Sequence, residues 1–136
     1  MDEKAIELAR YRLERAKQDL VDTELLYKNK SLLAANNRAY YSIFHAIQAV
    51  LSMERIDFKR HKDVIAYFNK NYVNTEIFPR ILGRKIGQAF QIREDSDYDY
   101  KFIPKIEQTE YQLQTAKELI ALVEEYINKR SKNDKT

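Results

Sequence analysis

Two residues of the sequence, Arg38 and His45, are spaced so that they can act together on one face of a helix. Seven residues make two helical turns, or about 10 Å of rise, and the rotation returns to within ~20° of its start. Tyr41 and Ser42 lie between them on the same strip. An arginine can hold a phosphate group, and a histidine can transfer a proton near neutral pH. The strip therefore has the groups for metal-free RNA cleavage, a base for a 2′-hydroxyl and a cation beside the developing charge.

The same strip also fits a purely structural role. In that interpretation, His45 is hydrogen-bonded to a neighbouring helix and Arg38 is paired with a carboxylate. Arginine and histidine occur seven residues apart often by chance, so the spacing alone favours the structural interpretation. In the same way, Tyr40, Tyr41 and Phe44 at helical spacing are more typical of a core than of a surface on which bases stack.

A second basic cluster follows the strip at Arg60, His61 and Lys62. These side chains can contact phosphate groups, and they equally fit solvated charge at a helix end. The acidic residues Asp95 and Asp97 lack the glycine turn and closing glutamate of a calcium loop. We therefore expect the acidic stretch to be a solvated loop.

Most other chemistries lack their residues in this sequence. It has no cysteine, which excludes disulfides, cysteine-ligated zinc and thiol catalysis. A Glu-x-x-His pattern is absent, Gly83 and Gly87 are isolated rather than part of a phosphate loop, and no serine-hydrolase elbow is present. The sequence therefore predicts neither a metal site nor a bound cofactor.

The composition predicts one helical domain. The 136 residues include only two glycines and two prolines, while 44% are hydrophobic and 33% are charged. So few helix breakers favour long helices over a sandwich or barrel. No apolar run approaches the ~20 residues that span a bilayer, and the charged N-terminus is unlike a signal peptide, so we expect a cytoplasmic protein without membrane contact. The net charge of +3 is compatible with nucleic acid but does not require it.

Apolar residues at spacings of three and four predict an antiparallel, up-and-down bundle of four main helices plus a short fifth. Residues 32–53 are apolar around most of the helix, which predicts a central position, and Pro79 and Pro104 are placed in the first turns of later helices. We expect one domain over residues 1–130 and a disordered polar tail over 131–136. The expected helices are 3–28, 32–53, 61–71, one from 79 into the acidic stretch 93–100, and one from 104.

The stretch from Asn37 to Ala46, NRAYYSIFHA, resembles the core motif of the HEPN superfamily, in particular its small prokaryotic branch. His61-Lys62 and the pattern of Arg93 followed by Asp97-Tyr98 extend the resemblance over most of the chain. The resemblance implies a helical bundle that forms a homodimer along the motif helices.

The resemblance also implies a function. Many members are metal-independent endoribonucleases with an Arg-x4–6-His motif at the dimer interface, and some are toxins paired with a nucleotidyltransferase antitoxin. We therefore predict Arg38 and His45 as catalytic residues in a toxin-like endoribonuclease. The predicted contacts to RNA or nucleotide are Asn37, Tyr41, Ser42, Arg60, His61 and Lys62.

Other members of the superfamily bind nucleotides or serve as helical scaffolds. The residue after the motif arginine is often polar in catalytic members, whereas it is Ala39 in this sequence. The alternative is therefore a non-catalytic module that binds a nucleotide or docks a partner protein.

Overall fold

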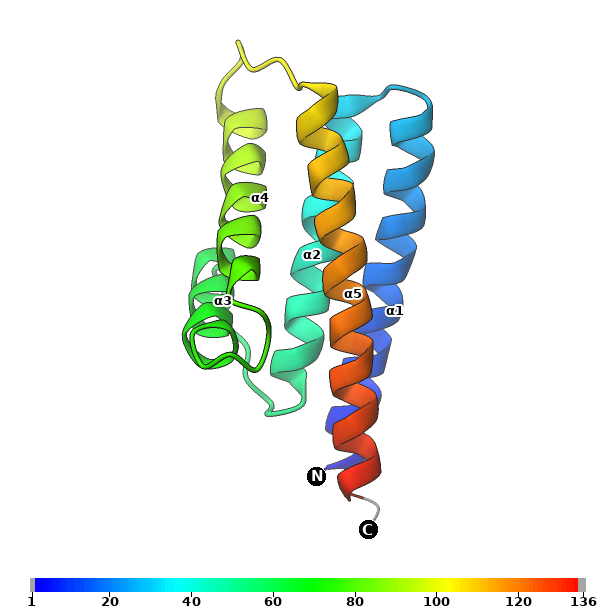
Figure 1. Cartoon of the computed structure of the whole chain (residues 1–136), viewed down its shortest axis with the longest axis vertical. Helices are drawn as coiled ribbons and strands as arrows, with labels where there is room; N and C mark the ends of the chain where they lie inside the picture. The colour runs from blue at the N-terminus through cyan, green and yellow to red at the C-terminus, as the bar shows by residue number, and fades with distance from the viewer. Residues whose placement is uncertain (1, 135–136) are drawn as a thin grey trace.

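The computed structural model describes residues 2–134, and every regular element in that range is helical. Four long helices lie side by side in alternating directions, and a short helix with a following π turn packs beside one end of α4 (Figure 1). This arrangement confirms the predicted all-α bundle. The elements are α1 (Glu3–Lys28), α2 (Leu32–Ser52), α3 (His61–Phe68), the π-helix η1 (Asn69–Val73), α4 (Ile81–Tyr98) and α5 (Ile106–Asp134).

Helix α2 is the centre of the bundle, because it packs against α1, α3, α4 and α5. Small residues line its contact with α1, and Ala9, Ala16, Ala39 and Ala46 are all fully buried. Small side chains let two helix axes approach closely. The close approach places side chains of α1 directly beside the polar strip of α2. Neither α2 nor any other helix in residues 2–134 combines the length and apolar content that crossing a membrane requires.

From Ala35 onwards, one narrow stripe of α2 remains accessible. Its partly exposed members are the adjacent pair Asn37 and Arg38, followed at intervals of three or four residues by Tyr41, His45 and Gln48. The opposite side of α2 is buried, with large side chains such as Ile43, Ile47 and Leu51 at no more than 1% exposure. Burying each of these side chains contributes roughly 1.5–3 kcal/mol, so the bundle holds the stripe in a fixed orientation.

Several expected helix ends differ from the structure by two or more residues. Pro79 and Pro104 lie two residues before α4 and α5 rather than inside their first turns. The acidic stretch, expected as a loop, is helical through Tyr98. Interactions four residues apart stabilise this last part of α4, because Gln91 donates a hydrogen bond to Asp95 at 2.9 Å and Arg93 pairs with Asp97 at 3.6 Å.

The expected disordered tail is also helical as far as Asp134, and residues 135–136 lie outside the described residues. Helix α1 covers this end of α5. Arg10 donates hydrogen bonds to Asn128 at 3.0 Å and to Ser131 at 3.3 Å, and Ser131 is buried. These contacts between the two helices explain why α5 continues beyond residue 130.

Candidate active site

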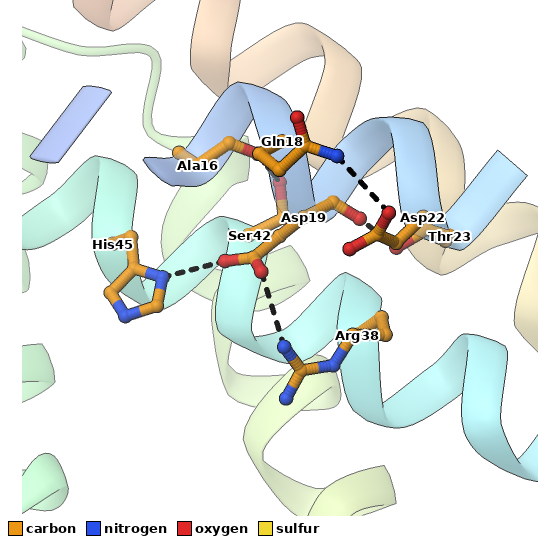
Figure 2. Close-up of polar contacts among 8 residues, drawn as sticks. All are labelled: Ala16, Gln18, Asp19, Asp22, Thr23, Arg38, Ser42 and His45. Atoms are coloured by element: carbon orange, nitrogen blue, oxygen red, sulfur yellow. Dashed lines mark hydrogen bonds and ion pairs between the residues drawn. The ribbon is translucent and has the colours of Figure 1, made fainter. Parts of the chain in front are cut away.

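A buried carboxylate on α1 brings the two residues of the predicted strip together. Asp19 accepts a hydrogen bond from Arg38 Nη1 on Oδ1 at 3.2 Å and one from His45 Nδ1 on Oδ2 at 2.6 Å. Its side chain is only 6% exposed. Arg38 and His45 both point towards it from α2 (Figure 2). We refer to Arg38, Asp19 and His45 as the Asp19 cluster.

The carboxylate of Asp19 determines which ring nitrogen of His45 is available. An ionised carboxylate can only accept hydrogen bonds, so Nδ1 carries the proton that is donated to Asp19. No described residue forms a hydrogen bond to Nε2, and the His45 side chain is 20% exposed. The second nitrogen therefore faces outwards as a group that can accept a proton.

Arg38 keeps unused donors beside this histidine. Its guanidinium carbon lies 4.9 Å from the centre of the Tyr41 ring, in a cation–π contact. Asp19 engages only one of its nitrogens, and the side chain is 36% exposed. Because a guanidinium has five N–H donors, Arg38 can still bind a phosphate oxygen while it is held by Asp19.

Hydrogen bonds to the backbone of α1 fix the position of Asp19. The Ser42 hydroxyl of α2 donates to the Ala16 carbonyl at 2.9 Å, and the Thr23 hydroxyl donates to the carbonyl of Asp19 itself at 2.7 Å. Figure 2 shows both hydroxyl residues beside Asp19, and both are fully buried. Asp19 therefore lies on a turn of α1 that is locked against α2.

The structure separates the predicted contact residues into different places. Ser42 is fully buried and holds α1 against α2, so it is not accessible to a substrate. Asn37 faces the end of α4 and lines a cavity of about 250 Å³ together with Ser96 and Asp97. Tyr41 is half-buried at the edge of the Asp19 cluster, with its ring centre 6.0 Å from that of His45.

The second predicted histidine belongs to a different environment. His61 Nδ1 is hydrogen-bonded to the Tyr40 hydroxyl at 2.8 Å, and its ring stacks on Phe44 with centres 4.0 Å apart. Burial lowers the pKa of His61, with smaller contributions from the charges of Arg93 and His45. Burial also raises the pKa of Tyr40, which keeps its phenol protonated. The pair is therefore neutral near pH 7.

Asp19 was not predicted from the sequence, and Arg93 was cited only for the family resemblance, although both residues shape this region. Asp19 follows Ala16 by three positions and precedes Thr23 by four, so an acidic residue within the buried row of α1 was the available signal. Arg93 donates to the Tyr41 hydroxyl at 3.3 Å and lies 5.0 Å from the Tyr40 ring centre. Among residues 2–134, no three histidine, aspartate or glutamate side chains are grouped so that they could hold a metal ion.

The sequence-family model of the HEPN domain matches residues 9–126 of this chain. The chain belongs to the HEPN domain family. The matched range includes Asp19, Arg38, His45, His61 and Arg93, so both histidine environments lie within the HEPN domain. Two curated relatives are similar over about 70% of each chain.

The first of these relatives is a "UPF0332 protein" from Thermotoga maritima, which is 38% identical over 96 residues, covering 71% of this chain and 70% of its own. The second is "Putative toxin MJ0142" from Methanocaldococcus jannaschii, which is 33% identical over 101 residues, covering 74% of this chain and 69% of its own. These are proteins to which this HEPN domain is similar.

The burial of Ala39 explains why this HEPN domain has a small residue after Arg38. Ala39 is fully buried, whereas Arg38 lies on the accessible stripe. A polar side chain at position 39 would require a buried hydrogen-bond partner in this bundle. The alanine therefore fits the packing and leaves the Asp19 cluster unchanged.

Proposed function

We propose that this HEPN domain is a toxin-like, metal-independent endoribonuclease in which Arg38 binds the scissile phosphate and His45 transfers a proton. One observation carries this proposal: Asp19 holds both side chains and leaves His45 Nε2 without a partner among the described residues. A buried carboxylate that orients a histidine towards an accessible position is the arrangement of a general base.

The chemistry follows from these positions. His45 Nε2 accepts the proton of a ribose 2′-hydroxyl, and the 2′ oxygen attacks the adjacent phosphorus. The bond from phosphorus to the 5′ oxygen breaks, which leaves a 2′,3′-cyclic phosphate and a 5′-hydroxyl that receives a proton. Arg38 stabilises the charge that develops on the phosphate oxygens. Asp19 keeps the imidazole in the orientation and tautomer that this step needs.

The proposed active form is a homodimer that pairs two α2 stripes. A second His45 in the same cleft would supply the proton for the leaving 5′ oxygen. Apolar side chains beside the stripe support such a contact, because Leu33 on α2 is 50% exposed and Leu8 on α1 is 42% exposed. Leu8 lies about three turns before Asp19 on the same face of α1. Sedimentation of the wild type and of a Leu33→Asp variant tests the dimer, which the variant should weaken.

The toxin-like role includes a partner that suppresses cleavage. The name of the Methanocaldococcus jannaschii relative describes that protein as a toxin, and the family resemblance implies a nucleotidyltransferase as the antitoxin. We infer that the protein encoded beside this chain is such a partner. Purification of the two proteins together should give a stable complex in which RNA cleavage is reduced.

The deciding experiment measures cleavage of single-stranded RNA in excess EDTA by the wild type, Arg38→Ala and His45→Ala. Gln88→Ala is the matched control, because Gln88 is exposed on α4 and lies outside both the α2 stripe and the Asp19 cluster. We expect the rate to fall by about 100- to 10,000-fold in the first two variants and to persist in the control. Circular dichroism checks that all variants keep their helices.

Two results would overturn the proposal. If His45→Ala cleaves RNA as fast as Gln88→Ala, the assigned proton transfer is wrong. If the wild type does not cleave RNA, the ribonuclease proposal is wrong, and the non-catalytic docking or nucleotide-binding module becomes the next function to test.

A further inference from the structure

A basic cavity lies between the start of α3 and helix α4. It has a volume of about 460 Å³ and is lined by Arg60, His61 and Lys62 at the start of α3 and by Phe90, Arg93 and Glu94 on α4. None of the three residues of the Asp19 cluster lines this cavity. The cavity is therefore a separate place at which a ligand can bind.

The charges of the cavity favour an anion. The cavity is lined by three permanent cations, Arg60, Lys62 and Arg93, and by one carboxylate, Glu94. Arg60 and Lys62 are exposed, and neither takes part in an ion pair or side-chain hydrogen bond among residues 2–134. Their charges are therefore not compensated by direct partners in that range.

Arg93 is held rigidly but retains donor capacity. Its contacts with Glu94 at 3.9 Å and Asp97 at 3.6 Å are too long for hydrogen bonds. Nη2 donates to the Tyr41 hydroxyl at 3.3 Å, whereas Nη1 forms no hydrogen bond among the described residues. The rings of Tyr40 and Tyr41, at 5.0 and 5.6 Å from its guanidinium carbon, fix the plane of the side chain. A planar guanidinium with free N–H groups is suited to phosphate oxygens.

His61 forms a flat, neutral wall of the same cavity. Its ring is fixed by Phe44 and by the Tyr40 hydroxyl through Nδ1, which leaves Nε2 without a hydrogen-bond partner among the described residues. Burial lowers the pKa of His61, so the wall adds a hydrogen-bonding nitrogen without a full charge. The permanent cations and this nitrogen together favour a group with several oxygen atoms over a halide ion.

We propose that this cavity binds a phosphate group, and that in a bound RNA strand it holds a phosphate next to the one at the Asp19 cluster. The placement of an RNA phosphate in the cavity rests on the proposed ribonuclease function, whereas the binding of a phosphate group there does not. Tyr41 links the two places, because its ring centre lies 6.0 Å from that of His45 and 6.1 Å from that of His61. The guanidinium groups of both Arg38 and Arg93 also lie close to its ring. A strand that crosses Tyr41 therefore passes near both cations.

The test uses a double variant, Arg60→Gln with Lys62→Gln, because both residues are exposed and the fold does not depend on them. The matched control is Lys117→Gln with Lys129→Gln, which removes the same charge from exposed positions on α5. Inorganic phosphate is titrated at constant ionic strength while NMR resonances of the His61 ring and of the backbone amide at position 62 are followed. We expect saturable shifts in the wild type and the control, and their loss in the double variant.

A second arm identifies the source of the phosphate. Binding of a single-stranded RNA oligonucleotide and of a nucleoside monophosphate is measured by fluorescence anisotropy and NMR in the His45→Ala background. We expect the double variant to bind the RNA about three- to tenfold more weakly than the control and to have a salt slope smaller by about one.

Each result has a distinct meaning. Equal phosphate shifts in the double variant and the wild type would overturn the phosphate site. If the double variant binds RNA as tightly as the control but no longer binds phosphate or the nucleotide, the cavity does not hold an RNA phosphate. That result would assign the cavity to free nucleotides. Phosphate binding by a wild type that does not cleave RNA would contradict the proposed function while supporting the cavity.

Discussion

The two histidines of this HEPN domain lie at nearly the same distance from one tyrosine, yet their partners differ in charge. The centre of the Tyr41 ring is 6.0 Å from that of His45 and 6.1 Å from that of His61. His45 donates to the buried carboxylate of Asp19, whereas His61 is hydrogen-bonded to the phenol of Tyr40 and stacks on Phe44. The same side chain is thus placed once beside an ion and once among aromatic rings.

This difference assigns different roles to the two imidazoles. Beside a carboxylate, a histidine has a compensating charge available when it takes up a proton. Among aromatic rings and near Arg93, a proton on His61 has no such compensation, and its pKa is lowered. We therefore expect His45 to serve in proton transfer and His61 to remain a neutral part of the packing and of the cavity wall.

Removal of the charge of Asp19 should have the largest effect on the difference between the two histidines. In Asp19→Asn, the amide has one acceptor oxygen and cannot accept hydrogen bonds from both Arg38 and His45 through separate oxygens. We expect RNA cleavage to fall by roughly 10- to 1,000-fold, because the imidazole loses its fixed tautomer and orientation. Single-turnover cleavage in EDTA measures the loss, and the ¹⁵N signals of the His45 ring report the change in tautomer.

Asp22→Asn is the matched control for this variant. Asp22 lies three residues further along α1, accepts a hydrogen bond from Gln18 at 3.2 Å and is outside the Asp19 cluster. The control removes the same charge from the same helix and should cleave RNA at nearly the wild-type rate. Equal rates for the two variants would show that Asp19 only stabilises the contact between α1 and α2.

Replacement of His61 should act on stability rather than on chemistry. His61→Ala removes the ring that stacks on Phe44 and leaves the Tyr40 hydroxyl without its partner. We expect the free energy of unfolding in urea to decrease by about 1–3 kcal/mol, while cleavage falls less than in Asp19→Asn. Asp63→Ala in the same turn of α3 is the control, because Asp63 is exposed and should change stability by less than about 0.5 kcal/mol. Lost cleavage at unchanged stability would instead place His61 in the reaction.

The sequence predicted the helices well wherever one apolar face is buried. The predicted bounds of α1 agree with the structure, and those of α2 differ by one residue, because apolar residues at spacings of three and four mark a buried stripe directly. Helix α4 ends within the acidic stretch where its end was expected, but Asp95 and Asp97 were interpreted as part of a solvated loop and are helical. Contacts such as the ion pair of Arg93 with Asp97 keep that stretch helical.

The candidate site was predicted only on one helix. Arg38 and His45 could be paired by their spacing along α2, but Asp19 is nineteen residues from Arg38 and on another helix. Its place depends on the register between α1 and α2, in which the Ser42 hydroxyl meets the Ala16 carbonyl at 2.9 Å. Local periodicity cannot give that register. The sequence therefore allowed the alternative in which Arg38 is paired with a carboxylate, but it did not identify Asp19 as that carboxylate. The structure contains this pairing, and the partner of His45 is the same carboxylate.

The smallest expected effect is a pH dependence of stability that comes from His61. Its pKa is lowered in the folded protein from the ordinary value of 6.5, chiefly by burial, so the unfolded chain takes up a proton more readily. The stabilisation is therefore complete above about pH 6.5 and is lost as the pH falls below it.

Replacement of His61 by phenylalanine keeps a ring beside Phe44 but removes the titration. We expect urea unfolding of His61→Phe to lose less stability than the wild type between about pH 7.5 and pH 5. In His45→Gln, the contribution of His61 should persist, since its ring remains buried against Phe44. If the free energy of unfolding depends on pH identically in the wild type and in His61→Phe, the lowered pKa of His61 is contradicted. The proposed difference between the two histidines would then be wrong.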